Sequence, residues 1–174
     1  SSDVCSSDLP ASNTWALAVR EDVARQASLR SMSDFARWVR AGGRVVLACS
    51  AEFANAGTLR SLETTYGFRL GPEQKIVLAG GETAATIAAA AARTNDVNVA
   101  MVYSTDGGIV SAQLRVLEDD RHDQPVYAPV PTVRGAVLER YPAMAGIVAP
   151  LMRSLDRERL QRLNERVQIG GEAP

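Results

Sequence analysis

Three aromatic side chains stand where polar and apolar stretches of the sequence meet. Trp15 follows the polar run Ser-Asn-Thr, Tyr103 ends the apolar run "NVAMVY", and Tyr127 lies between two prolines. The face of an aromatic ring attracts a cation by about 0.5–2 kcal/mol, more where water is excluded. A fully methylated ammonium group has no N–H to donate, so rings can hold it where hydrogen bonds cannot. Together the three rings predict a cage for such a cation, provided that the fold gathers them at a cleft.

Five other aromatic residues follow helix or strand patterns instead. We interpret the following five as packing residues: Phe35, Trp38, Phe53, Tyr66 and Phe68. Their spacing is that of an apolar face rather than of a ligand site. The candidate cage is therefore limited to the three rings that border polar segments.

Other groups that could do chemistry are sparse. Gly80-Gly81 precedes a predicted helix whose amides could meet an anion, but a single glycine pair is more typical of a tight strand-to-helix turn. The only histidine, His122, and the acids of "LEDDRHDQ" lack metal-ligand spacing and indicate a solvated loop. Dinucleotide, P-loop and serine-hydrolase motifs are absent. We predict no catalytic residue, no metal site, no cofactor and no enzymatic activity.

The composition excludes several classes of protein. The chain has 174 residues, 46% of them apolar, which is enough for the core of one large or two small domains. Its 19 basic and 20 acidic residues give a net charge of −1, which argues against a nucleic-acid partner. No apolar run approaches the roughly 18 residues of a membrane span. Two cysteines are too few for a disulfide framework or a zinc site.

The elements that must position the rings follow from hydrophobic periodicity. Apolar runs predict strands at 44–50, 75–80 and 98–103, a strand or a buried crossover at 14–19, and a further strand within 111–120 that leads into a charged turn. A helix capped by Ser31 or Ser33 ends at Gly42-Gly43, another ends at Gly67, and an alanine-rich helix follows Glu82. Strand and helix alternate from 44 to 103, which predicts an α/β domain with a parallel, helix-covered sheet. Ligands of such sheets bind beyond the carboxyl ends of the strands, where Tyr103 stands.

The two ends of the chain differ from this central part. "SDVCSSDL" resembles the translation of a sequencing adapter, so we interpret residues 1–11 as an adapter artefact or a disordered tail. The segment that follows the apolar run at 14–19, as far as Arg30, is a polar stretch. Toward the end, the sequence predicts three helices interrupted at Pro142 and Pro150, the last of them capped by Asp156. We expect these helices to leave the α/β unit, which we take to end near residue 105.

Several stretches, in this order, resemble one protein family. They are "SNTWALAV", "SMSDFARWV", "LETTYGF", "GETAATI", "AMVYSTDGG", "VLEDD", "QPVYAPVPTVR" and "LQRLNERVQIGGE". Together they are similar to the substrate-binding proteins of ABC importers for osmoprotectants such as glycine betaine, choline and carnitine. The resemblance runs from about residue 12 to the end, and "NTWALAV", "VYSTDGG" and "LEDD…QPVYAP" are its most specific parts.

The resemblance implies a two-lobed periplasmic-binding fold of type II that closes on its ligand. Residues 12–105 would form the second α/β lobe, and 106–174 the return segment and C-terminal helices of an incomplete first lobe. Trp15, Tyr103 and Tyr127 fall on the family's aromatic box, with tryptophan where tyrosine is common, and backbone near Asn13 would also contact ligand. Many members have an arginine for the ligand carboxylate where this chain has Asn55-Ala56, which leaves the choice of solute open.

The same resemblance implies partners and a location. The ligand would be a quaternary amine, the partners would be the permease subunits of an ABC importer, and the protein would work outside the inner membrane, meeting the membrane only through the transporter. Two alternatives remain at this point. One is a type II effector-binding domain of a transcription regulator. The other is a small α/β transferase whose "AGGET" turn holds a phosphate.

Overall fold

A computed structural model describes residues 11–55, 57–127 and 130–173. Its core is a five-stranded sheet with the order β3-β2-β4-β1-β5. The strands are β1 (Trp15–Arg20), β2 (Leu47–Ser50), β3 (Lys75–Leu78), β4 (Val99–Tyr103) and β5 (Leu114–Val116). β2 pairs in parallel with β3 and β4, whereas β1 runs antiparallel to both β4 and β5. The predicted α/β fold and its parallel strands are confirmed, and β1 makes the sheet mixed.

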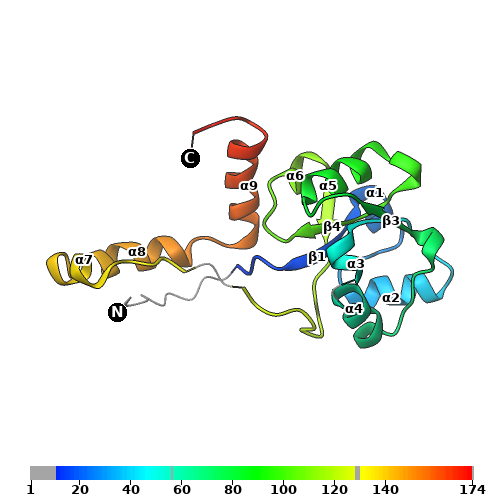
Figure 1. The fold of residues 1–174 in the computed structure, drawn as a ribbon, viewed down its shortest axis with the longest axis horizontal. Helices are drawn as coiled ribbons and strands as arrows, with labels where there is room; N and C mark the ends of the chain where they lie inside the picture. The colour runs from blue at the N-terminus through cyan, green and yellow to red at the C-terminus, as the bar shows by residue number, and fades with distance from the viewer. Residues whose placement is uncertain (1–10, 56, 128–129, 174) are drawn as a thin grey trace.

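Helices cover one face of the sheet, and the larger part of the hydrophobic core lies between them and the strands. They are α2 (Met32–Arg40), α3 (Ala51–Asn55) and α4 (Thr58–Tyr66), and they lie below the sheet in Figure 1. Ser31 caps α2 as predicted, in a capping box: its side chain accepts the Asp34 backbone N–H, and the Asp34 carboxylate accepts the Ser31 backbone N–H. Gly67 ends α4 with φ at +69°, the left-handed conformation that glycine adopts without strain. Phe35 and Phe53 are fully buried on this face.

The other face of the sheet carries smaller side chains. α5 (Thr83–Ala92) and α6 (Gly108–Ser111) cover it, above the sheet in Figure 1. Ala18, Ala48 and Ala100 of three neighbouring strands are fully buried there, together with Ala90 of α5. Alanines on both sides let α5 lie close to the strands, as its alanine-rich sequence predicts.

One helix lies where the sequence reads as a polar stretch. α1 (Glu21–Gln26) follows β1 directly, with Ala24 buried and Val23 packed against the core. The other short elements are the 3-10 turns η1 (Pro72–Gln74) and η2 (Thr94–Asp96). β5 pairs with β1, so the sheet takes in residues beyond 105. The division of the chain into lobes at that residue stays a prediction.

The last three helices are α7 (Gly135–Arg140), α8 (Met144–Arg153) and α9 (Arg157–Gln168). Asp156 caps α9 as predicted, and Pro142 separates α7 from α8, but Pro150 lies inside α8 and the predicted interruption there is wrong. The proline cannot donate to the carbonyl of Gly146, which is exposed and can bond to water instead. Among the described residues, no helix has the length and apolar character that crossing a membrane requires.

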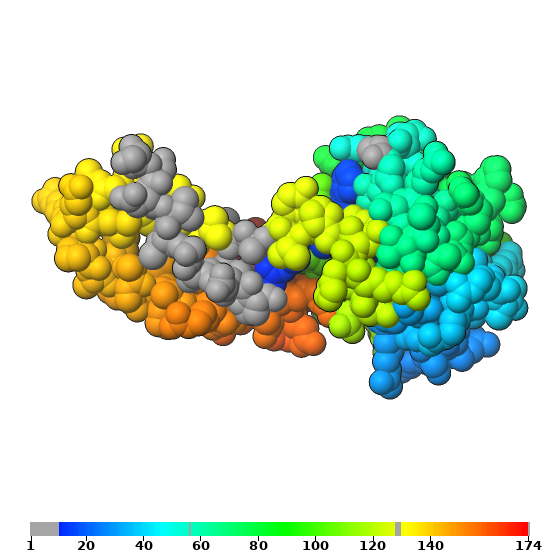
Figure 2. All heavy atoms as spheres, turned by 90° about the horizontal axis from the view of Figure 1, so that it is seen from below, coloured from blue at the N-terminus to red at the C-terminus, as the bar shows by residue number. Residues whose placement is uncertain are grey.

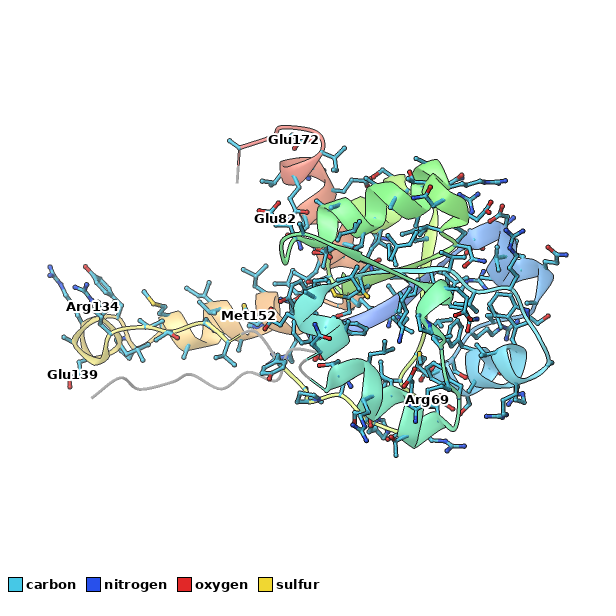
Figure 3. All side chains as sticks on the ribbon, turned by 45° about the vertical axis from the view of Figure 1, so that its right-hand side comes forward. Arg69, Glu82, Arg134, Glu139, Met152 and Glu172 are labelled. Atoms are coloured by element: carbon cyan, nitrogen blue, oxygen red, sulfur yellow. The ribbon has the colours of Figure 1, made fainter. Side chains whose placement is uncertain are left out.

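α7 and α8 form an arm that stands off from the sheet and its helices, whereas α9 turns back to lie beside α6 (Figure 1). Figure 2 shows the arm as a separate projection of the surface. Arg134 and Glu139 lie at its far end and Met152 at its near end (Figure 3). Ile147 is 74% exposed and Leu151 is 57% exposed, so the arm carries apolar surface that the described residues leave uncovered. The interpretation of residues 1–11 falls outside the described residues, except for Ala11, which is buried.

Candidate ligand site

The pairing of β1 with β4 brings two of the predicted site residues together. Trp15 and Tyr103 are direct partners in the antiparallel register, so their side chains point to the same face of the sheet. The ring centroids are 6.1 Å apart and the ring planes are inclined by 30°. The pair continues a row of buried partners, Leu17 with Met101, to the end of β4. The two rings therefore lie where the buried row reaches the ends of two interior strands, the start of β1 and the end of β4.

Phe53 adds a third ring to this pair. Its centroid lies 5.8 Å from that of Trp15, at an interplanar angle of 80°. Phe53 belongs to α3, which follows the carboxyl end of β2, the strand next to β4. The sequence interpretation of Phe53 as a packing residue holds for its burial but missed its contact with Trp15. The signal was its place just after a strand, the same kind of position as Tyr103.

Hydrogen bonds fix the chain on either side of the pair. The Ser104 N–H donates to the Thr14 carbonyl at 2.9 Å, which extends the β1–β4 ladder by one rung. The Ser104 hydroxyl donates to the carbonyl of Ser12. The Tyr103 N–H donates to the Asp106 carboxylate at 2.8 Å and so begins the turn that ends β4. These hydrogen bonds thus fix the backbone of both strands beside the two rings.

Asn13 and Tyr127 are neighbours through their backbones. The Asn13 N–H donates to the Tyr127 carbonyl at 2.9 Å, and the Tyr127 N–H donates to the Ser12 hydroxyl at 3.0 Å. The Asn13 side-chain oxygen accepts the Thr105 hydroxyl at 2.7 Å. Tyr127 is 62% exposed, and within the described part of the chain its ring makes no pair with the other two. The structure thus joins all four predicted residues into one region but places only two of the three rings side by side.

Two cavities lie near the aromatic pair, and each is lined by only one of its two residues. One of about 560 Å³ is lined by Trp15, Thr14 and Ser104, and also by Asp119 and Gln124. The other, about 700 Å³, is lined by Tyr103 and Asp106, with small apolar side chains of α5 and with Gly108 and Ser111 of α6. Each volume is within the range of small-molecule sites. Each residue of the pair therefore borders a space large enough for a small solute, and the two spaces are separate.

A carboxylate already lies at the N-terminal end of α5, where the sequence allowed an anion. Asp106 accepts hydrogen bonds from the Thr83 side chain in the first turn of α5 and from the Tyr103 N–H. Burial raises the pKa of Asp106 above its ordinary value. A phosphate at this turn would meet that carboxyl group, so the geometry favours the tight turn over the phosphate site.

The acidic loop is anchored to α4 rather than merely solvated. Asp119 accepts the Tyr66 hydroxyl, and Asp123 accepts a hydrogen bond from Ser61 at 2.8 Å. Burial, followed by the bond to Asp119, raises the pKa of Tyr66. His122 is exposed at the tip of the loop. In the part of the chain that the structure describes, no cluster of histidine, cysteine and acidic side chains could hold a metal ion.

The comparison with protein families decides the assignment. The family model OpuAC, described as the substrate binding domain of ABC-type glycine betaine transport system, matches residues 2–174. The chain belongs to the OpuAC family. This membership confirms the resemblance that the sequence motifs indicated, and it supports neither the regulator nor the transferase alternative.

Curated relatives agree with the OpuAC assignment. The chain is 48% identical over 163 residues to the glycine betaine-binding protein YehZ of Escherichia coli strain K12. It is 31% identical over 169 residues to the glycine-betaine-binding protein of Pseudomonas aeruginosa. Each match covers 93% of this chain and 53% of the relative. The chain therefore spans about half the length of these relatives.

Solved structures give the same fold. Apo YehZ from Escherichia coli superposes with a TM-score of 0.88 at 46% identity, covering 95% of this chain and 59% of that one. A structure described as a glycine betaine/carnitine/choline ABC transporter gives a TM-score of 0.79 at 26% identity, covering 96% and 58%. The predicted fold of a periplasmic substrate-binding protein, present in part, is confirmed.

Proposed function

We propose that this chain is part of a solute-binding protein that delivers quaternary-ammonium osmoprotectants, such as glycine betaine or choline, to an ABC importer. The observation that carries the proposal is the adjacent pair of Trp15 and Tyr103 rings at the carboxyl end of β4, in a member of the OpuAC family. The ligand's methylated nitrogen sits against these rings, and Tyr127 contributes a further face.

The energetics suit a solute that has no N–H to donate. Two cation–π contacts supply about 1–4 kcal/mol in total, more when the ligand is desolvated. Trp15 and Tyr103 are both partly buried, so their positions are set by packing before the ligand arrives. Little ordering entropy is then lost on binding.

The rest of the ligand meets polar groups near the rings. Asn13 contributes through its side-chain N–H groups, since its side-chain oxygen already accepts the Thr105 hydroxyl. Asn55 is exposed at the end of α3, where many relatives would have an arginine nearby, and Ala56 lies outside the described residues. With no arginine at this position, choline or another betaine competes with glycine betaine as the physiological solute.

The remaining parts of the proposal follow from the family. The protein binds and releases its solute without catalysing a reaction and without a cofactor. It acts outside the inner membrane and meets the membrane through the permease subunits of its transporter. Because the chain spans about half of its relatives, its cleft is one wall of the complete site. The chain alone is expected to bind solute weakly.

A chimera tests the proposal. The matched segment of Escherichia coli YehZ is replaced by this chain, so that the relative supplies the other half, and binding of glycine betaine and choline is measured by calorimetry. Trp15→Ala and Tyr103→Ala should each weaken binding by roughly 3- to 30-fold, the equivalent of one cation–π contact. Trp38→Phe, a change on α2 away from the site, should leave affinity unchanged. A folded chimera that binds no quaternary amine, or one that is indifferent to both alanine variants, refutes the proposal.

A further inference from the structure

The C-terminal helix α9 makes the contacts from which a second layer of the ligand site can be inferred. Two amide side chains one helical turn apart, Gln161 and Asn164, point at the loop that follows Tyr103. The Gln161 Nε2 donates to the Ser104 carbonyl at 2.7 Å, and the Asn164 Nδ2 donates to the Thr105 carbonyl at 2.7 Å. Gln161 is only 8% exposed, so its bond is shielded from water.

Each amide is bonded to one of two sets of hydrogen bonds that lead to the candidate site. Ser104, held by Gln161, forms the ladder rung next to the Trp15–Tyr103 pair through its bond to Thr14. Thr105, held by Asn164, donates its hydroxyl to Asn13. Asn13 in turn donates its backbone N–H to the carbonyl of Tyr127. The two sets of hydrogen bonds therefore run from one helix, one to the Trp15–Tyr103 pair and the other to the Tyr127 segment.

The backbone of α9 is also unusually close to this loop. A Cβ atom at Gly107 would lie 2.3 Å from the Glu165 backbone nitrogen and 2.5 Å from the Asn164 carbonyl carbon. Gly107 has φ of −67°, which any residue can adopt, so the approach of α9 is what requires glycine here. The loop and the helix thus fit in one arrangement, which the two amides fix.

We propose that Gln161 and Asn164 are positioning residues of the ligand site, which set the arrangement of the Trp15–Tyr103 pair relative to the Tyr127 segment. The inference rests on the proposed function for its ligand, but the positioning itself is a property of the unliganded chain. Neither residue is expected to touch the solute. Loss of either bond frees the loop after Tyr103, so that the Trp15–Tyr103 pair and the Tyr127 segment can move independently.

The first test needs no ligand. In a Trp38→Phe background, Trp15 is the sole tryptophan, and its emission and acrylamide quenching report the packing around it. Gln161→Met keeps the size of the side chain and removes the donor, and Gly107→Ala pushes α9 away by a different route. Both should shift the Trp15 signature in the folded protein. Arg162→Met, an exposed change on the same helix, is the control and should not.

The second test measures function in the YehZ chimera. Gln161→Met should weaken quaternary-amine binding by about three- to tenfold, the worth of one ordinary hydrogen bond, and Arg162→Met should not. A merely structural role would lower stability in urea while leaving the Trp15 signature of the folded state unchanged, and that result overturns the inference. If the parent chimera binds no amine, the proposed function fails, while the fluorescence comparison still decides the positioning role.

Discussion

Trp15→Phe tests how the buried indole of Trp15 contributes to the stability of the chain. The indole Nε1 of Trp15 is buried and finds no hydrogen-bond acceptor among the described residues. Burying an N–H without a partner costs about 1–3 kcal/mol. Phenylalanine removes that N–H while keeping a ring that can pack against Phe53 and Tyr103.

The loss of ring volume opposes this gain. Trimming a large core side chain to a smaller one commonly costs about 1–2 kcal/mol. The two contributions nearly cancel, so the free energy of unfolding of Trp15→Phe should lie within about 1 kcal/mol of that of the parent. Trp15→Ala also removes the two aromatic contacts, worth about 0.5–1.5 kcal/mol each, and should lose about 2–4 kcal/mol.

Urea denaturation of the 174-residue chain checks this, with far-UV circular dichroism as the signal, because the fluorescence of Trp15 is lost in the variant. The midpoints of the parent and of Trp15→Phe should nearly coincide, with Trp15→Ala well below both. A loss above about 2 kcal/mol for Trp15→Phe would mean that the indole N–H does have an acceptor. The account of Trp15 as a packed but unpartnered ring would then be wrong.

Two further predictions concern groups beside the site. Tyr66→Phe removes the hydroxyl that donates to Asp119 and accepts the Arg121 N–H, so it should destabilise the chain by about 2–3 kcal/mol; a thermal midpoint unchanged from the parent would contradict this. Burial raises the pKa of Asp106, so its stabilising contribution is fully present below the pKa of an unfolded aspartate, about 4, and is lost as pH rises through the folded pKa. Asp106→Asn can still accept the Tyr103 N–H, and its unfolding free energy should fall less across that interval in denaturation at several pH values; equal slopes for parent and variant would exclude the shift.

Local signals in the sequence were enough for most of the α/β unit. Buried apolar runs marked the strands, and caps such as Ser31 and Gly67 marked the helix ends. The sequence does not predict α1 because its residues are mostly polar, with Ala24 as its one buried side chain, so its periodicity is weak. The interruption predicted at Pro150 is wrong because the carbonyl that this proline leaves without a helical partner belongs to Gly146, which is exposed and can bond to water.

The site could be predicted only in part. The sequence shows that Trp15 and Tyr103 lie where polar and apolar stretches meet. It does not show that the two residues are paired, because their register depends on β1 inserting beside β4 in the sheet. Phe53 and Gln161 are joined to the site by contacts between residues far apart in sequence. Spacing along the chain does not encode such contacts.

Stepwise methylation of the ligand nitrogen gives the most direct measure of the central claim. Dissociation constants are compared in the YehZ chimera for glycine, its N-methyl and N,N-dimethyl derivatives, and glycine betaine. Each methyl group removes an N–H and adds apolar surface against the rings, so affinity should rise along the series, and Tyr103→Ala should flatten that rise. Affinity that is constant or falls with methylation would show that hydrogen bonds, rather than aromatic faces, hold the nitrogen.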